Sequence, residues 1–231
     1  MQQPALASRL LSLALFSAVA PVGSAMASGF YGGDPYAAYP NIPLFAGYQP
    51  ASIVGMAYDD FDWPAGTGTI GMVGGNFWGP SVGSFDSAYW EIRSGMSAGN
   101  GGTLVASGWG TPTVSATGFT QGGSAVWRVE LAITGVTLAS GSYWFAMAVD
   151  DPAHSGAFVA NTTGVNGIGP SVGNNALLYD NGTSFWNFRQ VGAGGDGYAG
   201  VDASYFISTV PAPGVLALLG LGGLGTVRRR R

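Results

Sequence analysis

The chain has 231 residues, of which 9% are charged, 40 are Gly, 13 are Pro and none is Cys. A charged fraction this low excludes a coiled coil, a solvated helical bundle and a charge-driven disordered chain. The absence of Cys excludes a disulfide framework, a thiol nucleophile and a zinc ribbon. Because turn residues are frequent and large apolar side chains are still numerous enough for a core, we predict an all-β fold.

The charges are distributed unevenly along the chain. All eight basic residues are Arg, and five of them lie at the ends, at Arg9 and at residues 228–231. The part between the ends contains three arginines and all 12 acidic residues, so its net charge is -9. We therefore expect no nucleic-acid partner, because a phosphate backbone requires a basic surface.

The N-terminus has the order of a secretory signal peptide. Arg9 precedes an apolar run over residues 10–20, and Pro21 and the small residues Ala25 and Ala27 follow. Small side chains at these two positions fit the pocket of signal peptidase. We predict that residues 1–27 are a signal peptide cleaved after Ala27.

Residues 28–50 form a lead-in rich in Pro, Tyr and Gly. Pro35, Pro40, Pro43 and Pro50 cannot donate to a central sheet ladder. We expect an extended segment whose aromatic side chains pack on the edge of the following domain.

Residues 51–209 are predicted to consist of short strands. The clearest signal is the period-two alternation of residues 125–134, and residues 143–149 repeat it after a Ser-Gly-Ser turn. Further strands are predicted at residues 52–58, 69–73, 87–93, 103–107, 113–119, 176–179, 184–189 and 203–207. About ten short strands separated by turns predict an antiparallel, jelly-roll-like β-sandwich, with a barrel as the alternative.

An acidic cluster at Asp59, Asp60 and Asp62 is the first candidate ligand site. Carboxylates on a loop provide the hard oxygen ligands that a structural calcium ion needs. These residues do not match the spaced calcium-loop motif, so the alternative is solvated turn acids that keep an uncharged surface soluble.

Trp63 and Trp78 are the second candidate ligand site. Each lies beside Pro or Gly at an expected loop, where an indole face can stack on a sugar ring. The alternative is that the seven tryptophans fill the core.

Catalytic motifs are sparse. The single histidine, His154, lies in an expected polar turn, and the chain has no Lys and no Gly-x-Ser-x-Gly motif. Hydrolysis by paired carboxylates such as Glu91 and Glu130 is open, although the sequence places no two of them together. We therefore expect a protein that is not an enzyme.

The C-terminus has three parts. Val210, Pro211, Pro213 and Gly214 precede an apolar run over residues 215–227, and Arg228, Arg229, Arg230 and Arg231 end the chain. The prolines separate the run from the folded body, and the 18 residues from Val210 to Val227 give about 27 Å of helix, a marginal membrane span. By the positive-inside rule, the arginines stop translocation and stay cytoplasmic.

This tail, behind a signal peptide and a body without Cys, resembles the PEP-CTERM sorting domain, which is also called the ice-binding protein C-terminal domain. The resemblance covers residues 210–231 only. It implies that Val210, Pro211 and Pro213 are recognised by an exosortase, a membrane enzyme that cuts near the Pro motif. Ala212 stands where the family's usual pattern has Glu.

The resemblance implies an exported bacterial protein, membrane-anchored before processing and then placed at the cell surface or in the exopolysaccharide matrix. We expect a non-enzymatic structural or adhesive role. The alternatives are a carbohydrate-binding module for extracellular polysaccharide and, more distantly, a glycan-cleaving enzyme.

Overall fold

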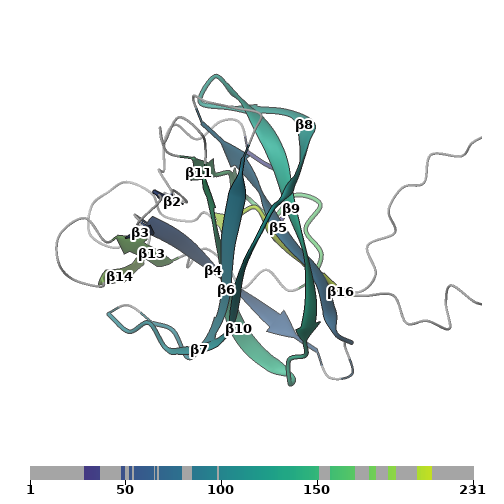
Figure 1. The fold of residues 1–231 in the computed structure, drawn as a ribbon, viewed down its shortest axis with the longest axis vertical. Coiled ribbons are helices and arrows are strands. Elements are labelled where there is room, and N and C mark those ends of the chain that lie inside the picture. Colours follow the sequence, from purple (N-terminus) through teal and green to yellow (C-terminus); the bar gives the residue numbers. More distant parts are fainter. Residues whose placement is uncertain are drawn as a thin grey trace, which may run out of the picture.

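A computed structural model shows two main antiparallel β-sheets. It describes residues 29–36, 48–49, 52–53, 55–64, 66, 68–79, 85–97, 99–150, 157–169, 177–180, 187–190 and 202–209. In Figure 1, β8, β9, β5 and β16 of the first sheet lie toward the right, and β13 and β14 of the second sheet lie toward the left.

The first sheet has the strand order β1-β16-β5-β9-β8, and a short strand, β11, pairs with the end of β5. Its strands are β1 (Gly29–Tyr31), β16 (Tyr205–Thr209), β5 (Ile70–Trp78), β9 (Ser124–Val136), β8 (Thr113–Gln121) and β11 (Phe158–Val159). Neighbouring strands are antiparallel throughout. Among the described strands, β1 and β8 are the first and last of this order, and Tyr31 of β1 also makes a single antiparallel bridge to Ile168.

The second sheet has the order β14-β13-β4-β10-β6-β7. Its strands are β14 (Asn187–Gln190), β13 (Leu177–Asp180), β4 (Gly55–Trp63), β10 (Gly141–Asp150), β6 (Ser87–Ser94) and β7 (Thr103–Gly110). Two small ladders complete the described strands, β2 (Tyr48–Gln49) with β3 (Ser52–Ile53), and β12 (Asn161–Thr162) with β15 (Asp202–Ala203).

The core lies between the two main sheets and follows from the period-two alternation of their strands. Phe145, Met147 and Val149 of β10 point into it, and Trp90 and Ile92 of β6 lie beside them. The intervening residues of these strands face the other way. The second sheet therefore has one face on the core and one face away from it.

A two-residue turn connects β8 to β9. Gly122 and Gly123 have φ angles of 57° and 81°, and the flanking residues Gln121 and Ser124 are paired. Two successive residues in the left-handed region form the tight turn whose twist matches an antiparallel hairpin, and glycine adopts it without strain.

The structure confirms the prediction of an all-β fold with packed antiparallel sheets. Each of the ten predicted strands overlaps an observed one, although β4 and β5 extend to Trp63 and Trp78, beyond their predicted ends. The lead-in differs more, because residues 29–31 form the edge strand β1, which pairs with β16. Backbone pairing with the first sheet therefore holds residues 29–31, and Phe30 is buried in the core.

Candidate binding face on the second sheet

The sorting motif, the Arg cluster and the signal cleavage residues lie outside the described residues. They are Val210, Pro211, Pro213, Gly214, Arg228, Arg229, Arg230, Arg231, Ala25 and Ala27. In the part of the chain that the structure describes, no helix has the length and apolar character needed to cross a bilayer.

Trp63 and Trp78 do not present a stacking surface. They are the last residues of β4 and β5, and only 2% and 8% of their surfaces are exposed. Trp63 belongs to the main core, and the Trp78 ring stacks on Phe158 with 4.8 Å between the ring centroids. This corrects the expectation of a sugar platform at these two residues and supports the alternative that they fill apolar clusters.

The acidic cluster likewise differs from its prediction. Asp59, Asp60 and Asp62 all lie within β4, not on a loop. Adjacent strand residues point to opposite faces; Asp59 is buried on the core side, whereas Asp60 and Asp62 are half-buried on the other. Among the described residues, no group of three or more His, Asp or Glu side chains is placed to hold a metal ion. The expectation of a calcium loop at these carboxylates is therefore corrected.

Asp59 instead joins two distant parts of the chain. Its Oδ2 accepts a hydrogen bond of 2.8 Å from the backbone N–H of Ala203, and its Oδ1 accepts one of 3.1 Å from that of Asp60. Burial raises the pKa of this carboxyl well above its usual range, and the charges of Asp202 and Asp60 raise it further.

This raised pKa predicts a stability that falls as the pH rises. Between the unfolded pKa of Asp59 and its higher folded pKa, the folded protein binds more protons, so the free energy of unfolding decreases with increasing pH. Asp202→Asn removes the neighbouring charge and is expected to make this decrease smaller and to move it to lower pH. Urea unfolding from pH 3.5 upward measures how the free energy of unfolding falls with pH in the wild type and in Asp202→Asn. An unchanged pH profile in the variant would contradict the effect of the Asp202 charge on Asp59.

A second apolar and aromatic cluster lies on the face of the second sheet that points away from the core, here called the outer face. It contains Met56 and Tyr58 of β4, Ala146 and Ala148 of β10, and Met96, with Tyr89 and Trp144 packed against it. Two rows cross this face in register. Ala146, Glu91 and Ser107 form one row, and Ala148, Tyr89 and Trp109 form the next.

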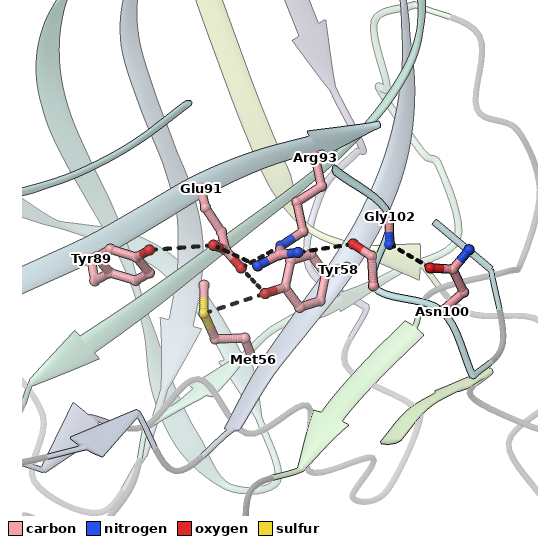
Figure 2. Close-up of polar contacts among 8 residues, drawn as sticks. Met56, Tyr58, Tyr89, Glu91, Arg93, Asn100 and Gly102 are labelled. Carbon is pink, nitrogen blue, oxygen red and sulfur yellow. Dashed lines mark hydrogen bonds and ion pairs between the residues drawn. The ribbon is translucent and has the colours of Figure 1, made fainter. Parts of the chain in front are cut away.

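A hydrogen-bonded group of charged and aromatic side chains occupies the middle of the outer face (Figure 2). The Tyr58 hydroxyl donates to Glu91 Oε1, and the Arg93 Nε donates to the same oxygen at 2.9 Å. Glu91 Oε2 accepts from the Tyr89 hydroxyl at 3.3 Å and from Arg93 Nη2 at 3.4 Å. A further bond of 2.9 Å joins Arg93 Nη1 to the carbonyl of Gly101.

The electrostatics of this group keep its donors protonated. Burial raises the pKa of Tyr58 far above its ordinary value, and the charge of Glu91 and the hydrogen bond to it raise it further. Burial also raises the pKa of Tyr89. Burial by itself lowers the pKa of Arg93, but the hydrogen bond and the charge of Glu91 outweigh it, so that pKa is raised overall. Two neutral tyrosines and a charged arginine therefore surround one carboxylate.

An exposed indole lies beside this group. Trp109 of β7 is 53% exposed, and its ring lies 4.8 Å from that of Tyr89, measured between centroids, with 42° between the ring planes. Tyr89 is itself half-buried and bonded to Glu91. The outer face therefore presents an aromatic surface that adjoins hydrogen-bonding groups, while the opposite charges of Glu91 and Arg93 offset each other.

This arrangement is better suited to binding than to proton transfer. Both oxygens of Glu91 accept bonds from donors of the protein, and the side chain is only 6% exposed. A general acid or base must instead reach the proton that it transfers. An indole face and adjacent polar groups, by contrast, provide the two kinds of contact that a sugar ring uses.

The sequence predicts which side chains of β6 lie together on the outer face. Tyr89, Glu91 and Arg93 alternate with Ala88, Trp90 and Ile92, so period two places the three polar residues on one side of a strand. Trp109 was missed because the strand at residues 103–107 was predicted to end before it, whereas β7 continues to Gly110.

No protein-family model, curated protein or solved structure matches this chain.

Proposed function

We propose that this protein is an exported, adhesive surface module with a jelly-roll-like β-sandwich that binds extracellular polysaccharide without cleaving it. The order of charged, apolar and small residues at the N-terminus supports export through signal peptidase. The Pro motif, apolar run and Arg cluster at residues 210–231 support membrane anchoring, processing by an exosortase-type enzyme, and final placement at the cell surface or in the exopolysaccharide matrix.

The observation that carries the binding proposal is the exposed Trp109 ring, which lies against the half-buried Tyr89 and two residues after the exposed Ser107 on the same face of β7. Pyranose C–H groups stack on aromatic faces, while hydroxyls bond to nearby polar side chains. Tyr89 links the two parts, because its ring contacts Trp109 and its hydroxyl bonds to Glu91.

Charge favours a neutral polysaccharide as the ligand. The body of the chain has a net charge of -9, which repels polyanions at low ionic strength. At the site, Arg93 is paired with Glu91 and so does not offer an isolated positive charge to an acidic sugar.

We expect Trp109→Ala to weaken binding to a neutral polysaccharide at least about tenfold, or about 1.4 kcal/mol, because a central aromatic contact is lost. Affinity electrophoresis in gels containing cellulose ethers, xyloglucan or mixed-linkage glucan measures the retardation directly. Phe119→Ala is the matched control, since Phe119 is an exposed aromatic (40%) on β8 of the other sheet.

Two outcomes would contradict this proposal. One is a wild-type protein that no neutral polysaccharide retards. The other is equal retardation of wild type and Trp109→Ala.

A further inference from the structure

The two main sheets have edges of very different length. Among the described residues, the edges on one side are β1, with three residues, and β14, with four. On the other side they are β7, with eight residues, and β8, with nine, and the short link at residues 111–112 keeps these two strands on the same side of the molecule. Proteins commonly shorten or charge their edge strands to prevent pairing with other chains.

The two long edge strands carry no charged residue. From Ser94 to Trp127 there is no Asp, Glu, Lys or Arg over 34 residues, while the rest of the body carries the net charge of -9. Two copies of this chain repel each other through their acidic surfaces. The repulsion is smallest when the uncharged sides face each other.

The same side exposes large apolar side chains. Leu104, Val105 and Trp109 of β7 and Phe119 of β8 are four of the seven large hydrophobic residues exposed among the described residues. Exposed apolar groups on an uncharged edge add hydrophobic contact to backbone pairing. A long, uncharged and apolar edge is a surface suited to a second strand of the same kind.

Strand regularity favours β7 over β8 as the pairing edge. The register of β8 shifts between Ala116 and Thr120, where Gly118 has a φ of 81° and the Thr117 hydroxyl donates to the carbonyl of Val126. Bulges of this kind turn an edge away from a partner. In β7, residues 106–110 pair with β6 in continuous register, and the shift lies before them.

We propose that two copies of this chain pair antiparallel through β7, joining their second sheets into one across a two-fold axis. The axis is perpendicular to the sheet, so each copy presents the same residues to the other. Main-chain hydrogen bonds provide the contact, as in other strand-addition interfaces.

The absence of Cys allows a direct test in the full-length chain. Ser107→Cys places one thiol on β7, and Ser115→Cys places one on β8; both serines are exposed on edge strands. With a short bis-maleimide crosslinker, which tolerates a range of registers, we expect Ser107→Cys to give a covalent dimer and Ser115→Cys to remain monomeric on denaturing gels.

A charge placed on β7 provides a second test of the proposed dimer. Val105→Lys in the Ser107→Cys background is expected to reduce the dimer at least tenfold, whereas Phe119→Lys in the same background is expected to leave it unchanged. Equal melting temperatures verify that each variant is folded. The proposal is overturned if Ser107→Cys gives no dimer, if Ser115→Cys gives as much, if Val105→Lys has no effect, or if the product has the mass of a complex with another protein.

Discussion

Replacing Glu91 with Ala is expected to lower the free energy of unfolding by about 3–5 kcal/mol, as for other buried ion pairs that lose one partner. Glu91 is buried and accepts hydrogen bonds from Tyr58, Tyr89 and Arg93, which come from two strands of the second sheet. Without the carboxylate, the half-buried Arg93 loses its hydrogen bonds to Glu91 and the negative charge that offsets its own. The buried Tyr58 hydroxyl loses the same acceptor.

The chain provides a matched control for this prediction. Arg128 and Glu130 form an ion pair with the same spacing, two residues apart on β9, at 2.7 Å, but both side chains are more than a quarter exposed. Glu130→Ala should therefore cost only about 0.2–1 kcal/mol, as exposed pairs do. Urea unfolding followed by Trp fluorescence compares the two variants. Equal losses in both would show that burial does not set the strength of the Glu91 group.

Gly74→Ala is expected to lower the free energy of unfolding by about 3 kcal/mol, at the upper end of typical overpacking costs. A methyl group at this position of β5 would lie 2.2 Å from Cζ of Phe206 and 2.3 Å from the carbonyl oxygen of Val129. The Phe206 ring cannot easily move outward, because the Arg128 guanidinium lies over it at 3.9 Å from the centroid. The carbonyl belongs to the neighbouring strand of the sheet.

Gly68→Ala is the control for Gly74→Ala. No atom of the described residues lies within 4 Å of a methyl group at Gly68, and its backbone is outside the left-handed region, so we expect a change within about 0.5 kcal/mol. Thermal unfolding of both variants separates steric crowding from a general effect of adding a methyl group. A Gly74→Ala variant as stable as Gly68→Ala would show that Phe206 and β9 can rearrange.

The strands could be predicted because their signal is local. In residues 125–134 and 143–149, alternation and the turn residues before each segment lie within a few positions of one another, and β9 and β10 form there. The same local rule places Tyr89, Glu91 and Arg93 on one face of β6.

The binding surface could not be assigned correctly, because burial depends on distant strands. Trp63 and Trp78 lie next to turn residues, yet β4 pairs with β10 and β5 with β9, and packing of the two sheets covers both rings. Trp109 lies in an equally apolar strand and remains exposed, since β7 is the last strand of its sheet.

The sequence by itself determined the uncharged segment from Ser94 to Trp127, the acidic body, the charged and apolar ends and the alternation of the strands, all of which are properties of neighbouring residues. Only the tertiary structure decided that Tyr58 meets Glu91 and that Asp59 meets Ala203, 33 and 144 positions away along the chain. The physical reason is that period two fixes which residues share a face of one strand. The order of strands in the sheets then decides which faces are covered and which charged groups find a partner.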